Sequence, residues 1–221
     1  MEQVTAAPRV LPRPLAGDRA GGTRHGLKKV LGVAAWQRLP EAVRERFSED
    51  SPDATYAGAY EIVRASLFGR LIAWLAVLFG TPVAPRVGTN VAACVKVRAH
   101  GAGVDWIRAY LWEDGRTHIV QSTKQVTPDG RLIEKLPAGL CMPLETYEER
   151  GVLHFVSRGY YIDPGLGMKL WLPEFLTPGV THVEHIDLGH GWFRFTMAVT
   201  HPLFGEVYFQ TGRFCAMEDL E

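Results

Sequence analysis

The sequence predicts an α+β protein, in which N-terminal helices pack on a curved, largely antiparallel sheet or barrel-like meander of about eight to nine strands. Before residue 82, apolar residues recur at the three- and four-residue spacing of helices. From Val87 onward they alternate with polar residues, as in half-buried strands. Short connections rich in Gly and Asp-Gly separate these stretches, which indicates hairpins between antiparallel strands rather than the long crossovers of a parallel sheet.

The length of 221 residues suits one domain. Residues 1–26 include Pro12-Arg13-Pro14 and Gly21-Gly22 and have no apolar segment, so we interpret them as a flexible N-terminal arm. The single α+β domain then covers residues 27–221. Its helical part extends to about residue 82, and its β-rich part covers residues 87–217.

Three helices are predicted in the first part. Residues 27–39 carry Leu27, Val30 and Leu31 at helical spacing. Pro40 begins a short helix over residues 40–47, because proline is favoured in the first turn. The most apolar stretch, residues 66–79, starts at Ser66, a residue type that caps helices, and ends before a Gly-Thr-Pro sequence at 80–82.

We interpret residues 66–79 as a helix packed on the sheet. A membrane span needs about 20 apolar residues, and Gly69 and Arg70 interrupt this stretch, so we expect no transmembrane span. The alternative is a weak interfacial contact with a membrane. The lack of a lysine-rich polar face counts against it.

Nine alternating stretches follow and are the predicted strands: residues 89–99, 104–112, 117–126, 132–136, 140–149, 152–162, 180–188, 192–200 and 206–217. The connection at residues 113–115 contains Asp114-Gly115 and that at 128–130 contains Asp129-Gly130, which supply the positive φ that tight turns need. Such a long meander tends to close, because closure removes exposed strand edges. Residues 172–178, between two strands, are interpreted as a helical turn or a lid over one end.

Composition excludes some functional classes. The 24 basic residues balance the 24 acidic ones, so nothing indicates a nucleic-acid partner. The three cysteines, Cys94, Cys141 and Cys215, are odd in number and far apart. They argue against a disulfide framework and, together with the absence of a signal-peptide pattern, for a cytoplasmic protein. The oligomeric state is left open.

The strand at residues 104–112 is the most informative stretch. Trp106, Arg108, Tyr110 and Trp112 share one face, because side chains alternate across a strand. Three large aromatic side chains around one guanidinium resemble the wall of a binding cavity. The alternative is a core strand whose arginine reaches the rim or pairs with a carboxylate.

Other aromatic and arginine side chains extend this set to a predicted ligand-binding site, with Arg158, Tyr160, Trp192 and Arg194 as further members. An arginine offers a fixed fork for a carboxylate or an enolate oxygen. Three functions remain open. The first is binding of a small, largely apolar ligand with an acidic or carbonyl head. The second is a cofactor-independent cyclase or isomerase acting on a polyketide-like substrate. The third is a structural or partner-interaction domain.

No residue is assigned a catalytic role, and no cofactor is expected. The sequence contains no nucleophile elbow and no phosphate-binding loop. Residues three apart on a strand face opposite sides, so His182 and His185 are not expected to share a metal ion, and we expect no stoichiometric zinc or iron. If a metal were bound, these two residues and His190 would be the first ligands to test. A nucleophilic cysteine remains open, but Cys94 and Cys215 lie on apolar strands, where a thiol is usually an inert small apolar residue.

Arg108 is expected to point into a cavity that is covered by the helix at 66–79 or by the segment at 173–178. A buried cation needs a partner. That partner is either a carboxylate of the protein, from Glu134, Glu145 or Glu184, or the acidic group of a ligand.

Several short motifs occur together in order: Trp36 with a Leu-Pro-x-x-Val-Arg sequence at 39–44, Trp106-x-Arg108-x-Tyr110, a Leu-x-Leu-Pro sequence at 170–173 and a His-Pro-Leu-Phe-Gly sequence at 201–205. In this combination the chain resembles the bacterial family of domains of unknown function DUF 4166, over roughly residues 30–217. The family usually has Phe at the position of Tyr110, and often a histidine at that of Phe47. The resemblance implies a one-domain fold and no established activity.

Overall fold

The computed structural model describes residues 26–51, 53–76, 84, 86–165 and 168–220. The predicted arm therefore lies, apart from Gly26, outside the described residues.

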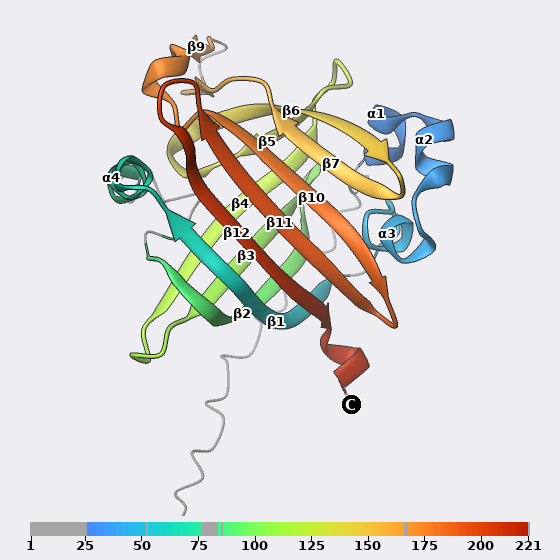
Figure 1. Ribbon diagram of the computed structural model, residues 1–221. Helices are drawn as coiled ribbons and strands as arrows, with labels where there is room; N and C mark the ends of the chain where they lie inside the picture. Colours follow the sequence, from blue (N-terminus) through green and yellow to red (C-terminus); the bar gives the residue numbers. More distant parts are fainter. Residues whose placement is uncertain (1–25, 52, 77–83, 85, 166–167, 221) are drawn as a thin grey trace, which may run out of the picture.

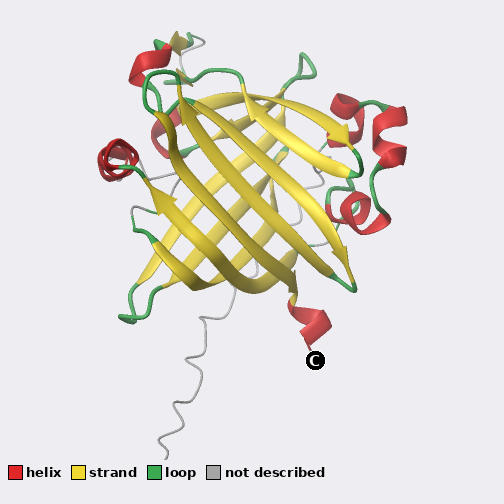
Figure 2. Ribbon diagram, viewed as in Figure 1, coloured by secondary structure: helices red, strands yellow, loops and turns green. Residues whose placement is uncertain are grey.

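One antiparallel sheet of twelve strands dominates the fold, and ten of them close into a barrel (Figures 1 and 2). Around the ring the order is β5-β4-β3-β2-β1-β12-β11-β10-β7-β6, and β6 pairs with β5 to close it. The strands are β1 Ala54–Ala65, β2 Gly88–His100, β3 Gly103–Leu111, β4 Thr117–Val126, β5 Leu132–Lys135, β6 Leu140–Glu149, β7 Val152–Ser157, β8 Tyr161–Ile162, β9 Leu170–Trp171, β10 Val180–Gly189, β11 Trp192–His201 and β12 Gly205–Ala216. The expectation of a curved antiparallel sheet is confirmed, and the expected eight to nine strands are too few.

The main element that the sequence analysis does not predict is the strand β1. It lies inside the stretch that is predicted to be helical up to residue 82. Its buried residues include Tyr56, Tyr60 and Val63, four and three residues apart, which is the spacing of a helix. A bulge between Tyr60 and Ile62 shifts the phase of the strand, and only the small residues Ala57, Gly58 and Ala59 lie between Tyr56 and Tyr60. β1 pairs with β2 and β12 and thereby joins the two halves of the ring.

A second difference concerns residues 152–162, predicted as one strand. They form β7 and then β8, with Gly159 at a φ of 84° between them. β8 follows β7 along the same edge of β6, and β9 pairs with β8. Three short 3-10 turns complete the description: η2 Pro137–Gly139, η3 Glu174–Leu176 and η4 Met217–Leu220. The turn η3 confirms the helical turn predicted between residues 172 and 178.

Three short helices lie at one end of the barrel (Figure 1). The single helix expected over residues 27–39 is two, α1 Leu27–Leu31 and α2 Val33–Arg38, because Gly32 with a φ of 85° interrupts it. Pro40 precedes α3 Glu41–Arg46. Phe47, directly after α3, contacts the rings of Trp106 and His185 inside the barrel, at centroid distances of 5.6 and 4.9 Å.

The helix α4, Leu67–Ala76, lies at the opposite end (Figure 1). The hydroxyl of Ser66 accepts a hydrogen bond from the Gly69 amide at 3.1 Å, which confirms the predicted cap. The predicted residues 77–79 and the Gly-Thr-Pro end lie outside the described residues. None of the described helices has the length and apolar character needed to cross a membrane.

Only one side of α4 packs on the barrel. Gly69 and Ala73 are buried, whereas Leu67, Leu71 and Trp74, at helical spacing, are 86%, 54% and 66% exposed. The exposed face continues onto neighbouring elements at this end. The rings of Phe68 and of Phe204, in the β11–β12 turn, are in contact, with their centroids 4.0 Å apart. We call this end of the barrel, with its exposed residues on α4, η3 and the β11–β12 turn, the apolar end.

Gly69 sets the distance between α4 and the barrel. A Cβ atom at this position would lie 1.9 Å from the carbonyl oxygen of Val207 in β12. Gly69→Ala is therefore expected to push the helix outward and to lower the free energy of unfolding by about 1–3 kcal/mol, as overpacked sites do. Urea unfolding measures this. The control Leu67→Ala changes an exposed residue of the same helix and should have a small effect; equal stability of the wild type and Gly69→Ala would contradict the close packing.

Candidate functional site

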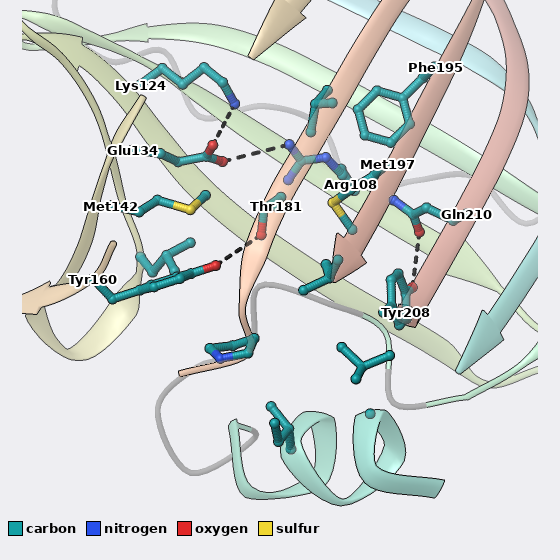
Figure 3. A pocket seen from close by; sticks show the side chains of 17 residues that line it. Arg108, Lys124, Glu134, Met142, Tyr160, Thr181, Phe195, Met197, Tyr208 and Gln210 are labelled. Carbon is teal, nitrogen blue, oxygen red and sulfur yellow. Dashed lines mark hydrogen bonds and ion pairs between the residues drawn. The ribbon is translucent and has the colours of Figure 1, made fainter. Parts of the chain in front are cut away.

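A cavity of about 60 Å³ lies inside the barrel, on the side of α4 (Figure 3). Its walls come from seven strands, from α4 and from the loops beside them. The apolar lining consists of Gly69, Ile72, Leu136, Met142, Pro178, Val183, Phe195, Met197, Val199 and Val207, and the polar lining of Arg108, Lys124, Glu134, Tyr160, Thr181, Tyr208 and Gln210. Arg108 is one of the lining residues, and Ile72 of α4 and Pro178 of the segment at 173–178 also contribute to the wall.

Two cations share one carboxylate in this cavity. Lys124 Nζ lies 2.9 Å from Glu134 Oε2, and Arg108 Nη2 lies 3.9 Å from Glu134 Oε1 (Figure 3). The guanidinium also donates a hydrogen bond to the Ser122 hydroxyl at 3.3 Å. All four residues are buried. The partner of Arg108 is therefore a protein carboxylate, Glu134, but one that has a second and closer cation.

The pKa shifts of Lys124 and Glu134 reflect the presence of two cations and one carboxylate. Burial lowers the pKa of Lys124, and attraction to Glu134 offsets the effect only in part, because Arg108 repels the ammonium. Burial alone would raise the pKa of Glu134, but Lys124 and Arg108 together outweigh it, and the pKa is lowered. Glu134 is therefore held as a carboxylate, and the local excess of charge is positive.

Neutral hydrogen-bonding groups lie on two other sides of the cavity. The Tyr160 hydroxyl and the Thr181 hydroxyl are 2.9 Å apart. Gln210 Oε1 accepts hydrogen bonds from Tyr110 and Tyr208, each at 3.0 Å, and its amide nitrogen points toward the cavity (Figure 3). Burial raises the pKa of Tyr110, Tyr160 and Tyr208, so these phenols stay protonated and act as hydrogen-bond donors.

The eight predicted ligand-binding residues separate into three groups. Arg108 and Tyr160 line the cavity. Trp106, Tyr110 and Trp112 are buried on the same face of β3 or just after it, as the alternation predicted, but they do not line the cavity. Trp106 belongs to the aromatic cluster around Phe47, and Tyr110 stacks on Tyr60 at a centroid distance of 4.8 Å.

The third group lies on the outside of the barrel. Arg158 forms an exposed ion pair with Glu145, which had been a candidate partner of Arg108. Trp192 is 39% exposed, and it and Arg194 alternate with the buried Phe193 and Phe195 of β11. These three residues and the cavity are thus on different faces of the sheet.

Lys124 was not among the predicted site residues, and Glu134 was named only as one of three candidate partners of Arg108, because charged residues on a strand are usually assigned to the solvent face. The sequence nevertheless contains a pattern that indicates this pair. Ser122 and Lys124 continue the inward series of Val120 on β4, and the hairpin at 128–130 places Lys124 opposite Glu134. Two opposite charges directly across a hairpin and in phase with an apolar face indicate a buried pair.

The histidines also divide between the two faces. His185 is buried inside the barrel, where burial holds its pKa well below the usual value, whereas His182 lies on the outer face. The expectation that these two cannot share a metal ion is consistent with this placement. His182 instead meets His154 of β7 and Glu184 on the outer face, with candidate ligand atoms within 4.8 Å of one another.

Cys94 is half-buried, and Cys141 and Cys215 are buried. Burial raises the pKa of Cys94 and of Cys141, so neither is activated as a thiolate nucleophile.

Comparison with known proteins gives one match. The family model described as "Domain of unknown function (DUF4166)" matches residues 39–214, which is most of the chain. Neither the curated proteins nor the solved structures returned a match.

Because Arg108 and Lys124 share the carboxylate of Glu134, we predict that removing the carboxylate lowers the free energy of unfolding more than removing one cation does. Glu134→Gln leaves two buried cations without an anion and should lower the free energy of unfolding by about 3–5 kcal/mol. Arg108→Met should cost less, because Lys124 and Glu134 remain as a pair. Urea unfolding of both variants tests this, with Glu145→Gln, in the exposed pair, as the control that should cost about 1 kcal/mol or less. Equal losses for Glu134→Gln and Glu145→Gln would contradict a buried charge cluster.

Proposed function

This chain belongs to the DUF4166 family, and we propose that it binds a small, largely apolar molecule whose acidic head enters the barrel cavity. One observation carries the proposal: two buried cations, Arg108 and Lys124, share the single carboxylate of Glu134. A buried charge without a partner is costly. A ligand carboxylate beside Arg108 and Lys124 would give each cation an anion, so the excess of positive charge favours an acidic ligand.

The surroundings of the charges support an amphiphilic ligand. The cavity wall beyond the charged residues is formed mainly by apolar side chains, such as Met142, Met197 and Val199. Tyr160 and Gln210 add neutral donors that can orient an oxygen-bearing group. A mostly apolar wall with a few placed polar groups is typical of sites for small molecules.

The size of the cavity limits the ligand. Pockets that enclose drug-sized molecules measure roughly 300–1,000 Å³, whereas the free space here is about 60 Å³. We therefore infer that the cavity holds the head and that the apolar tail extends past Ile72 and Pro178 toward the apolar end.

The alternative of a cyclase or isomerase receives less support. A general acid or base works best when its pKa lies near the working pH. Among the described cavity-lining residues, the pKa of Glu134 is lowered and the pKa values of the tyrosines are raised, so both move away from neutral pH. Burial also lowers the pKa of Lys124, but Glu134, 2.9 Å from the ammonium, stabilises its charged form. These groups can bind an acid or polarise a carbonyl, but they are poorly matched to proton transfer at neutral pH.

The alternative of a partner-interaction domain is favoured by one observation, the exposed Leu67, Leu71 and Trp74 on α4. It can be separated from ligand binding by a double variant, Leu71→Ser with Trp74→Ser. If the cavity carries the function, this variant retains head-group binding and its dependence on Lys124.

The proposed site predicts a preference for acids over alcohols of the same chain. Isothermal titration of the delipidated protein with octanoic acid and with 1-octanol should show tighter binding of the acid. Lys124→Met should weaken binding of the acid by about tenfold or more, since 1.4 kcal/mol corresponds to a factor of ten, and should leave binding of the alcohol nearly unchanged. Loss of both ligands in a folded variant, or of neither, would contradict a role of Lys124 in recognising the head.

Binding of the acid is also predicted to weaken as the pH rises. Burial lowers the pKa of Lys124, so the ammonium loses its proton at a lower pH than an exposed lysine does. Above that pH, one of the two cations no longer attracts the ligand carboxylate. Affinity for octanoic acid measured from neutral pH up to the ordinary lysine range should therefore fall in the wild type. It should stay flat in Lys124→Met, and a flat wild-type profile would contradict the prediction.

A further inference from the structure

The outer face of the barrel carries a cluster of metal-binding side chains that is separate from the cavity. It consists of His154 on β7 and of His182 and Glu184 on β10. The strand register places Glu184 directly opposite His154 and His182 opposite Val156. Because side chains alternate, these three residues share one face, while Phe155, Val183 and His185 point into the barrel.

The distances within the cluster fit a transition-metal ion. His154 Nδ1 lies 3.0 Å from His182 Nε2 and 3.7 Å from Glu184 Oε1. Ligands about 2.0–2.1 Å from a tetrahedral zinc ion are roughly 3.3–3.4 Å apart, and the two distances lie on either side of this value. The third pair of ligand atoms lies within 4.8 Å, so a small side-chain rotation would complete the set.

The rings are also held in place. Tyr147 of β6 pairs with His154 across the strands and stacks flat on its imidazole, with ring centroids 4.5 Å apart and planes at 8°. The ring of His182 stacks on His154 at 5.2 Å from the other strand. Neighbours that fix the orientation of a ligand ring are typical of built metal sites.

We propose that His154, His182 and Glu184 bind one Zn²⁺ ion or a similar divalent transition-metal ion on the outer face of the barrel. Two imidazoles and one carboxylate suit such ions, whereas Mg²⁺ and Ca²⁺ prefer sites made only of oxygen ligands. Glu184 and Tyr147 are partly exposed, so water can take the remaining coordination position. This proposal differs from the expectation, drawn from the sequence, that no stoichiometric zinc or iron is bound.

The position of the site indicates a role for the ion. The pairing between β7 and β10 covers only four residue pairs, from His182 with Val156 to His185 with Leu153. A metal bound by one ligand from β7 and two from β10 would join this short seam of the ring. Zinc binding should therefore raise the thermal stability of the protein.

The test is titration of zinc chloride into the full-length protein after removal of metals with a chelator. The wild type should bind one Zn²⁺ per chain and melt at a higher temperature with zinc than without it. His182→Ala and Glu184→Gln change partly exposed residues and should weaken zinc binding at least about tenfold. His190→Ala, which removes an exposed histidine from the adjacent turn, is the matched control and should bind as the wild type does.

Two results would overturn the proposal. One is a wild type that binds no zinc with 1:1 stoichiometry at millimolar concentration. The other is equal zinc affinity of His182→Ala, Glu184→Gln and His190→Ala, which would place the bound ion elsewhere on the chain. Circular dichroism of each variant without metal establishes that the fold is intact, so a loss of affinity can be assigned to the missing ligand.

Discussion

The short strand β5 closes the ring and places the charge cluster at the same time. It pairs with β4 on one side and with β6 on the other, over four residue pairs each. The same pairings bring Glu134 to the inner face, opposite Lys124. A sheet that remained open at β5 would leave two strand edges exposed and Glu134 in water. The carboxylate that holds Lys124 and Arg108 inside the barrel therefore exists as a buried group only because the barrel closes.

The interior is divided along the barrel. At the end covered by α1–α3, the rings of Phe47, Trp106, Phe155 and His185 fill the space. Toward α4, the three charged side chains line the cavity of about 60 Å³. Eight strands enclose an interior just wide enough to be filled by side chains, and ten enclose more. Helices and aromatic rings fill one end of this wider barrel, and the cavity occupies the other.

Electrostatics distinguishes the two proposed sites, one inside the barrel and one on its outer face. Inside, cations exceed anions in a low-dielectric environment, which strengthens the attraction for an anionic ligand. Outside, His154, His182 and Glu184 offer lone pairs instead of charge-assisted donors, and they suit a metal cation. β10 contributes to both sites, since Thr181 and Val183 face the cavity while His182 and Glu184 face outward. One strand with strict alternation can thus separate two kinds of chemistry by the thickness of a sheet.

The sequence by itself determined the antiparallel sheet, eight of its twelve strands as separate segments, the Ser66 cap and the inward face of Trp106, Arg108, Tyr110 and Trp112, because alternation and turn chemistry are local properties. It also led to the family to which the chain belongs. The bulged strand β1 required the tertiary structure, since its buried residues imitate helical spacing. So did the partner of Arg108, because Glu134 lies on β5, and the pairing of β5 with β6 that closes the ring keeps this carboxylate inside the barrel. The meeting of His154 with His182 depends on the register between β7 and β10, which are distant in sequence, and register between distant strands is fixed by packing of the whole barrel.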